Sequence, residues 1–329
     1  MRFVNLSAAA FLAASVLLAQ NAIPRQPIID MHVHAAMSMG GQPACANTPA
    51  FLASDPAQKE DRFGWKPVAC ANPLLPAKTP ESYEKEVLAE MERLNVTAVT
   101  MGDEKTVNQW KADAPGRIIP GTAFDRAALS GPKKEAELKR LREAFTNGGF
   151  KVMGEIGLQY EGLSPSDPAA EEYFALAEEL DVPVGIHMGT GGSGRANLTT
   201  PKFRGSMGNP LLLEDLLARH PKLRLWIMHA GYPMIDDLLT LLQANSHVYV
   251  DVAGLIWSYP IGEVNRYIER IVQAGFEDRV MFGTDQLLWP NLMSQSIDII
   301  DTAEYLTPEQ KRDILDNNAA RFLRLDQKK

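Results

Sequence analysis

Near the N-terminus the chain reads Ile-Ile-Asp-Met-His-Val-His, with two histidines two positions apart. Side chains alternate between the two faces of a strand, so Asp30, His32 and His34 are predicted to share one face, and Met31 and Val33 the other. Two imidazoles along one face of a strand suit two ligands of one metal ion. The alternative is an ordinary strand with two incidental histidines, because this motif is short enough to arise by accident.

Four more residues of metal-ligating types follow short apolar stretches later in the chain: Glu155, His187, His229 and Asp285. Each stretch reads as a buried strand, for example Leu-Trp-Ile-Met before His229. Of the six histidines in the chain, the remaining two have structural explanations. His220 ends a predicted helix, where a donor suits the last carbonyl groups, and His247 begins a predicted strand at the opposite rim.

The elements that must position these residues follow a regular rhythm. Apolar stretches predict strands at 28–34, 96–100, 117–123, 150–157, 182–187, 223–229, 247–252 and 279–285. Helical spacing predicts helices at 81–95, 103–112, 133–147, 168–180, 210–219, 234–243, 261–274, from 291, and 307–323. Eight strands, each followed by a helix, predict a parallel (β/α)8 TIM barrel as a single catalytic domain, with an open doubly wound sheet as the alternative. In a barrel the candidate ligands would meet at the rim where the strands end.

Composition and the first residues suggest where the protein works. The chain has 329 residues and a net charge of -8, with no basic run, which argues against a nucleic-acid partner. Residues 1–22 have the layout of a signal peptide, with an apolar run too short to span a membrane. We therefore expect export to the periplasm or the medium, no membrane attachment after signal removal, and a barrel domain at 23–329. A buried N-terminal helix is the alternative.

The two cysteines, Cys45 and Cys70, fit an exported protein. Both lie in an irregular segment after the first predicted strand. In an oxidising compartment they would form a disulfide that stabilises the fold by roughly 3 to 4 kcal/mol. Two free, buried thiols are the alternative, because the sequence does not supply the distance between them.

Together these motifs resemble the metal-dependent amidohydrolase superfamily. The resemblance rests on Ile29–His34, on His187 and His229, and on the segments 282–285 (Phe-Gly-Thr-Asp) and 318–323 (Asn-Ala-Ala-Arg-Phe-Leu). It covers about residues 28 to 325 and is closest to the amidohydrolase-related group, which also includes non-oxidative decarboxylases. It implies that one metal is bound by His32, His34 and Asp285, with His187 completing the ligand set and His229 acting behind it.

Glu155 adds a second implication. The segment Gly-Glu-Ile-Gly-Leu at 154–158 is similar to strand four of the TatD-type nucleases, in which a glutamate helps to hold two metals. In that arrangement Glu155 would bridge the two metal ions, and His187 and His229 would hold the second ion. Many superfamily members use a carboxylated lysine instead, but Lys151 lies too far below the rim. The alternative for Glu155 is a supporting hydrogen bond to a ligand.

The ligand set predicts the chemistry. Histidine nitrogens and a carboxylate suit zinc, although manganese or iron would also be accepted. A metal-activated water would hydrolyse a C–N or C–O bond of a small-molecule substrate, with Asp285 transferring the proton. Two other readings remain: a lyase that decarboxylates an aromatic or enol acid, and a barrel that binds without turnover. A phosphodiester substrate is disfavoured by the acidic net charge.

Two residues in the rim loops are candidate substrate contacts. Arg195 lies in a glycine-rich segment at 189–208, which we expect to act as a lid with no helix starting at Arg195. Its charge suits a substrate carboxylate, and Trp257 suits an apolar or aromatic pocket; surface charge and core packing are the respective alternatives. Relatives often pair, so a homodimer is one possible assembly.

Overall fold

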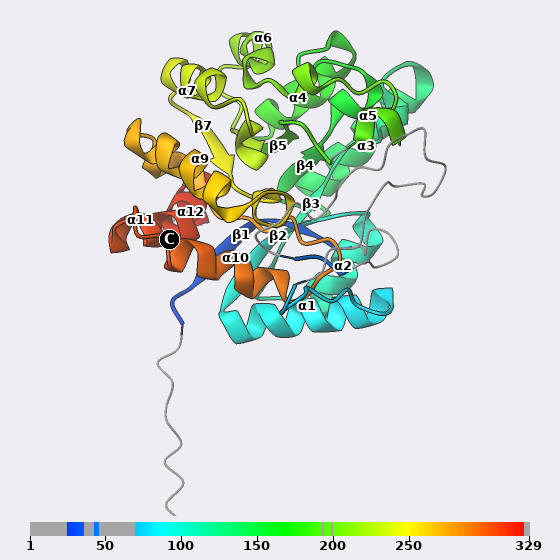
Figure 1. Cartoon of the computed structure of the whole chain (residues 1–329). Helices are drawn as coiled ribbons and strands as arrows, with labels where there is room; N and C mark the ends of the chain where they lie inside the picture. The colour runs from blue at the N-terminus through cyan, green and yellow to red at the C-terminus, as the bar shows by residue number, and fades with distance from the viewer. Residues whose placement is uncertain (1–24, 36–42, 46–69, 193, 199, 326–329) are drawn as a thin grey trace, which may run out of the picture.

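Eight parallel strands form a nearly closed barrel with helices on the outside (Figure 1). The structure, a computed structural model, describes residues 25–35, 43–45, 70–192, 194–198 and 200–325. Neighbouring strands pair in chain order, and the segment that follows β8 returns to β1, where the Met31 N–H donates to the Phe282 carbonyl at 2.9 Å. The (β/α)8 barrel is therefore confirmed, and the open sheet is excluded. The strands are β1 (Ile28–His34), β2 (Val96–Met101), β3 (Ile118–Thr122), β4 (Val152–Ile156), β5 (Val184–His187), β6 (Leu225–Met228), β7 (Val248–Asp251) and β8 (Val280–Met281).

The elements follow the predicted rhythm, with differences that include two near the rim. The segment at 195–198 forms one helical turn, so the prediction that no helix starts at Arg195 is wrong. Strand β8 is shorter than predicted and ends before Asp285. The predicted signal segment lies outside the described residues. The helices are α1 (Pro80–Leu94), α2 (Glu104–Asp113), α3 (Gly131–Thr146), α4 (Glu171–Glu179), α5 (Arg195–Leu198), α6 (Glu214–Arg219), α7 (Ile235–Ala244), α8 (Leu255–Ser258), α9 (Ile261–Gln273), α10 (Leu292–Asp301), α11 (Pro308–Arg312) and α12 (Asn318–Leu323).

Helix α1 shows how the local sequence defines an element. Thr79 and Ser82 form a capping box at its start, where Pro80 occupies the first turn, and Asn95 ends it in the left-handed conformation. Its buried residues recur at helical spacing and face the barrel: Tyr83, Val87, Met91 and Leu94. Among the described residues, no helix has the length and apolar character needed to cross a bilayer.

Apolar side chains form two clusters in the core. The larger cluster joins the outer faces of the strands to the helices. The smaller one fills the barrel interior and is closed at its base by α12, which contributes Phe322. Trp226 of β6 lies across this interior against Gly185 of β5, where a Cβ atom would come within 2.3 Å of the indole ring. The interior below the rim is therefore packed with side chains, which leaves the mouth for polar groups.

Strand β1 departs from strict alternation. Ile29 and Met31 both belong to the interior cluster, whereas Val33 packs in the outer cluster. The prediction that Met31 and Val33 share a face, opposite Asp30, is therefore wrong. The reason is a shift of the β1–β2 register between Asp30 and Val33, which inserts an extra residue into the inward-facing row.

A disulfide joins Cys45 to Cys70. Of the two alternatives stated above, the disulfide is therefore confirmed and the pair of free thiols is excluded. Close to Cys45, the backbones of Ala44 and Leu74 exchange two hydrogen bonds of 3.0 and 2.7 Å as an antiparallel bridge. The segment between β1 and α1 is thus closed covalently across 25 positions.

Replacing both Cys45 and Cys70 with alanine should lower the free energy of unfolding by about 3 kcal/mol, because the unfolded chain loses its closed loop. Chemical denaturation of the variant and of the oxidised wild type measures this difference. Reduced wild type is the matched control and should behave like the double variant. Equal stability of the oxidised protein and the variant would contradict the prediction.

Candidate metal centre

The mouth of the barrel brings a first group of three candidate ligands together. The Nε2 atoms of His32 and His34 lie 3.2 Å apart. The Oδ1 atom of Asp285 lies 3.5 Å from Nε2 of His32 and 3.2 Å from Nε2 of His34. Ligand atoms around a tetrahedral zinc with bonds of about 2.0–2.1 Å are separated by about 3.4 Å. The three atoms therefore fit one divalent cation without rearrangement.

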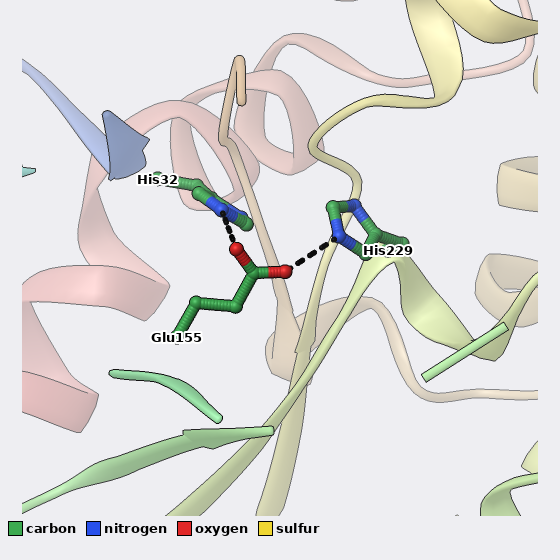
Figure 2. Close-up of side chains that lie close together, drawn as sticks. All are labelled: His32, Glu155 and His229. Carbon is green, nitrogen blue, oxygen red and sulfur yellow. Dashed lines mark ion pairs between the residues drawn. The ribbon is translucent and has the colours of Figure 1, made fainter. Parts of the chain in front are cut away.

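Glu155 links this group to the other two histidines. Its Oε2 atom lies 3.6 Å from Nε2 of His32 and 3.5 Å from Nε2 of His34. Its Oε1 atom lies 3.6 Å from Nε2 of His187 and 3.5 Å from Nε2 of His229. Figure 2 shows the carboxylate between His32 and His229, with one oxygen directed at each ring. All six predicted side chains thus gather at one mouth of the barrel.

Unusual backbone conformations aim two of these side chains. His229 follows β6 and begins a short turn with φ of 59°, and Asp285 has φ of 55° beyond β8. Such left-handed conformations are uncommon for residues other than glycine. Gly254 lies against both: a Cβ atom there would be 2.9 Å from Nδ1 of His229 and 3.1 Å from Oδ2 of Asp285. The absence of a side chain at Gly254 therefore leaves room for these two groups.

A register shift also turns Glu155 inward. Met153 and Ile156 of β4 both pack in the outer cluster, although they are three positions apart. The β4–β5 register shifts between them, so that Gly154 and Glu155 both face the interior. The similar irregularity in β1 allows His32 to face inward although its neighbour Met31 also packs in the interior. Lys151, the rejected alternative at strand four, is exposed before β4 begins.

Residues that the sequence analysis missed hold His187. The Gln159 side-chain amide lies 2.6 Å from its Nδ1, and the Tyr160 hydroxyl lies 2.5 Å from its Nε2. Both come from a short 3-10 helix, Leu158–Glu161, that follows β4. Gln159 and Tyr160 directly follow the predicted fourth strand, which was the only hint in the sequence that they lie near the rim. Nothing in the sequence showed that this turn reaches His187 at the end of β5.

Asp251, at the end of β7, was also missed. It is fully buried, and its Oδ2 lies 3.5 Å from Nδ1 of His32. The same carboxylate accepts hydrogen bonds from Nε1 of Trp226 (3.0 Å) and from the backbone N–H of His229 (2.9 Å). Carboxylates behind a ligating histidine fix its ring orientation and tautomer. The available signal was a carboxylate at the end of an apolar strand. The sequence analysis did not use it because the predicted strand, 247–252, ended one residue after Asp251.

Charge and burial oppose each other across the centre. Burial disfavours ionisation of Glu155, but His187, His229 and His32 outweigh it and hold the pKa of Glu155 well below its usual range. Burial also disfavours protonation of His32, yet Asp285 and the other carboxylates raise its pKa well above the usual value. Burial, together with the charge of His229, lowers the pKa of His187 well below its usual value. A bound cation would replace the protonated histidines as the positive charge that stabilises these carboxylates.

Asp30 supports the backbone from below the centre. Its carboxylate accepts hydrogen bonds from the backbone N–H of His32 (2.9 Å), the backbone N–H of Thr284 (3.0 Å) and the Thr284 hydroxyl (2.6 Å). Burial raises its pKa to about 7, although these hydrogen bonds act in the opposite direction. Asp30 thus links β1 to the segment that carries Asp285.

The remaining predicted residues lie outside the ligand group. Trp257 is buried in the core, where its indole N–H donates to the Thr284 carbonyl at 3.2 Å, and its role as a substrate contact stays a prediction. Arg195 is half-buried at the mouth. His220 ends α6, between the carboxylates of Glu171 and Glu178 at 3.0 and 3.1 Å, as expected for a structural histidine.

Replacing Asp251 with asparagine should weaken zinc binding about tenfold to a hundredfold, because His32 loses the carboxylate that orients its ring. Competition with a chromogenic chelator measures the affinity, and circular dichroism checks the fold. Asp236→Asn is the matched control, since that exposed carboxylate only pairs with Arg270 on the surface. Zinc affinity equal to that of the wild type would rule out this role.

Comparison with known proteins agrees with this geometry. No curated protein sequence matches the chain. Solved structures with the same fold include an uncharacterised TIM-barrel protein from Bordetella bronchiseptica, with a TM-score of 0.63 and 16% identity over 91% of this chain and 99% of that one. A probable 2-pyrone-4,6-dicarboxylic acid hydrolase from Acinetobacter baumannii has a TM-score of 0.55 and 13% identity over 91% and 99% of the two chains. A 5-carboxyvanillate decarboxylase from Novosphingobium aromaticivorans, complexed with manganese, has a TM-score of 0.54 and 16% identity over 72% and 79%. The amidohydrolase family model matches residues 29–325, and the chain therefore belongs to the amidohydrolase family.

Proposed function

We propose that the protein is a metal-dependent hydrolase that cleaves a C–N or C–O bond of a small-molecule substrate. The observation that carries this proposal is the triangle of His32, His34 and Asp285, whose ligand atoms have the spacing of a tetrahedral zinc site. Manganese is the alternative ion, because the donor set also suits it. Members of this family bind a divalent metal, and the described residues offer a complete donor set for one.

The metal ion, Asp285 and His229 would each have a separate role in hydrolysis. A divalent cation held here would lower the pKa of a water molecule to about 7 and polarise the scissile carbonyl group. Asp285 directs Oδ1 towards the two histidines of β1, and its Oδ2 faces Gly254 and stays available. This oxygen accepts the proton of the attacking water and passes it to the leaving group. His229 acts beside it as a ligand or as a hydrogen-bond donor.

A pair of cations is the arrangement that Glu155 supports. Its two oxygens lie at nearly equal distances, 3.5–3.6 Å, from the two pairs of histidines. His187 and His229 would hold the second ion, with Glu155 between the two sites. The alternative is one ion, with Glu155 acting only as a hydrogen-bonding neighbour of the ligands.

Non-oxidative decarboxylation of an aromatic or enol acid is the second candidate. The same centre suits this reaction, and decarboxylases are among the structures that share the fold. We favour hydrolysis because export would separate the protein from catabolic intermediates inside the cell. The Cys45–Cys70 disulfide supports export, since disulfides persist mainly in oxidising compartments.

Zinc-loaded protein should hydrolyse at least one member of a panel of lactones, esters, amides and cyclic amides, and chelation should abolish this activity. Asp285→Asn should lower kcat about a hundredfold to ten-thousandfold, because the proton acceptor is lost. Asp236→Asn, on the surface of α7, should leave kcat unchanged. Release of carbon dioxide from a panel of aromatic acids, without hydrolysis of the first panel, would favour the decarboxylase instead.

Glu155→Gln should reduce the bound zinc from two ions per chain to one, because a neutral amide cannot bridge two cations. Elemental analysis of dialysed protein measures the stoichiometry. Glu161→Gln is the matched control and should retain two ions, because Glu161 is a half-buried carboxylate outside the centre that pairs with Arg126 and Lys202. A single ion in the wild type would refute the bridged pair while leaving the hydrolase proposal intact.

A further inference from the structure

Arg195 carries a positive charge near the candidate metal centre, and no acidic side chain among the described residues pairs with it. Its Nε atom is buried and makes no hydrogen bond. In the part of the chain that the structure describes, no ion pair involves Arg195. The acidic residue of this region, Glu161, pairs with other cations instead, with Nε of Arg126 at 3.7 Å and Nζ of Lys202 at 3.9 Å. An unpaired guanidinium that is partly removed from water is costly unless an anion binds to it.

Tyr160 connects this guanidinium to the metal centre. The Arg195 Cζ atom lies 4.5 Å from the centre of the Tyr160 ring, in cation–π contact. The hydroxyl of the same ring lies 2.5 Å from Nε2 of His187. The ring is held edge-on to His187, with centroids 4.9 Å apart, and contacts Phe203 with centroids 5.8 Å apart. Arg195 is thus separated from the candidate ligands by one aromatic ring.

The glycine-rich segment holds Arg195 in this position. Gly191 has φ of +64°, and a Cβ atom there would lie 3.3 Å from the Tyr160 hydroxyl and 3.4 Å from Arg195 Nε. The backbone therefore packs against the edge shared by these two side chains. The Arg195 N–H also donates to the Gly192 carbonyl at 3.2 Å, which closes the turn. These contacts orient the guanidinium before any ligand arrives.

We propose that Arg195 binds a carboxylate group of the substrate while the reacting carbonyl lies at the metal centre. This inference rests on the proposed function for the position of the reacting group, and it narrows the substrate class to small carboxylic acids. The guanidinium fork matches a planar carboxylate, with which it forms paired, charge-assisted hydrogen bonds.

The neighbouring carboxylates favour a carboxylate over a phosphate. Arg126 and Lys202 both pair with Glu161, so Arg195 is the cation of this region that has no carboxylate partner among the described residues. A phosphate group carries about -1.5 to -2 at pH 7. It would also lie near Glu155 and Asp285, whose negative charges would repel it more strongly than a single carboxylate.

The test uses benzoate and its neutral analogue benzamide as probes, with binding measured by calorimetry. The zinc-loaded protein is titrated first, and the metal-depleted full chain second, so that binding to zinc itself is separated from binding to Arg195. Arg195→Met should weaken benzoate binding about tenfold to a hundredfold in both forms, the range for a lost charge-assisted hydrogen bond. Arg195→Lys should weaken it less, because the charge remains.

Arg126→Met is the matched control. Its guanidinium contacts the same Tyr160 ring at 5.8 Å but is paired with Glu161, so benzoate affinity should not change. Benzamide should bind weakly and with equal affinity to the wild type and the Arg195→Met variant. Failure of the wild type to bind benzoate, equal benzoate affinity in Arg195→Met, or equally tight Arg195-dependent binding of inorganic phosphate would each overturn the proposal. The metal-depleted titration does not require zinc or turnover, so failure of the proposed hydrolase would be recognised separately.

Discussion

The interaction on which the rest of the centre depends is the approach of the Glu155 carboxylate to four imidazoles. Its two oxygens face His32, His34, His187 and His229 at 3.5–3.6 Å, close to the ligand separation around a small cation. Buried charges at such distances are stable only when opposite charges or a metal compensate them. The barrel therefore has to supply both the ligands and the groups that hold them.

The supporting groups come from strands and turns far apart in the sequence. Asp251 of β7 lies behind His32, the Ala253 carbonyl lies 2.8 Å from Nδ1 of His229, and Gln159 contacts His187. Because each support contacts the ring nitrogen that faces away from the centre, Nε2 is the atom presented to a cation. This shared orientation explains why three strands can act as one ligand group.

The Tyr160 hydroxyl, 2.5 Å from Nε2 of His187, connects the centre to the segment that carries Arg195. Tyr160 stands between His187 and Arg195, so a single aromatic ring separates the candidate ligands from a cation that forms no ion pair among the described residues. A substrate that contacts both would be held at two points. Fixing two points aligns the reacting carbonyl with the attacking water and reduces the entropy lost in reaching the transition state.

The sequence by itself determined the barrel, the six candidate ligands and their place at one rim, because strand and helix periodicities and strand-end polar residues are local patterns. The disulfide remained one of two alternatives. Only the tertiary structure decided the register shifts that turn His32 and Glu155 inward, since a bulge depends on pairing with the neighbouring strand. It likewise decided the supporting roles of Asp251 and Tyr160, because their partners lie on other strands and no local spacing in the sequence encodes those contacts.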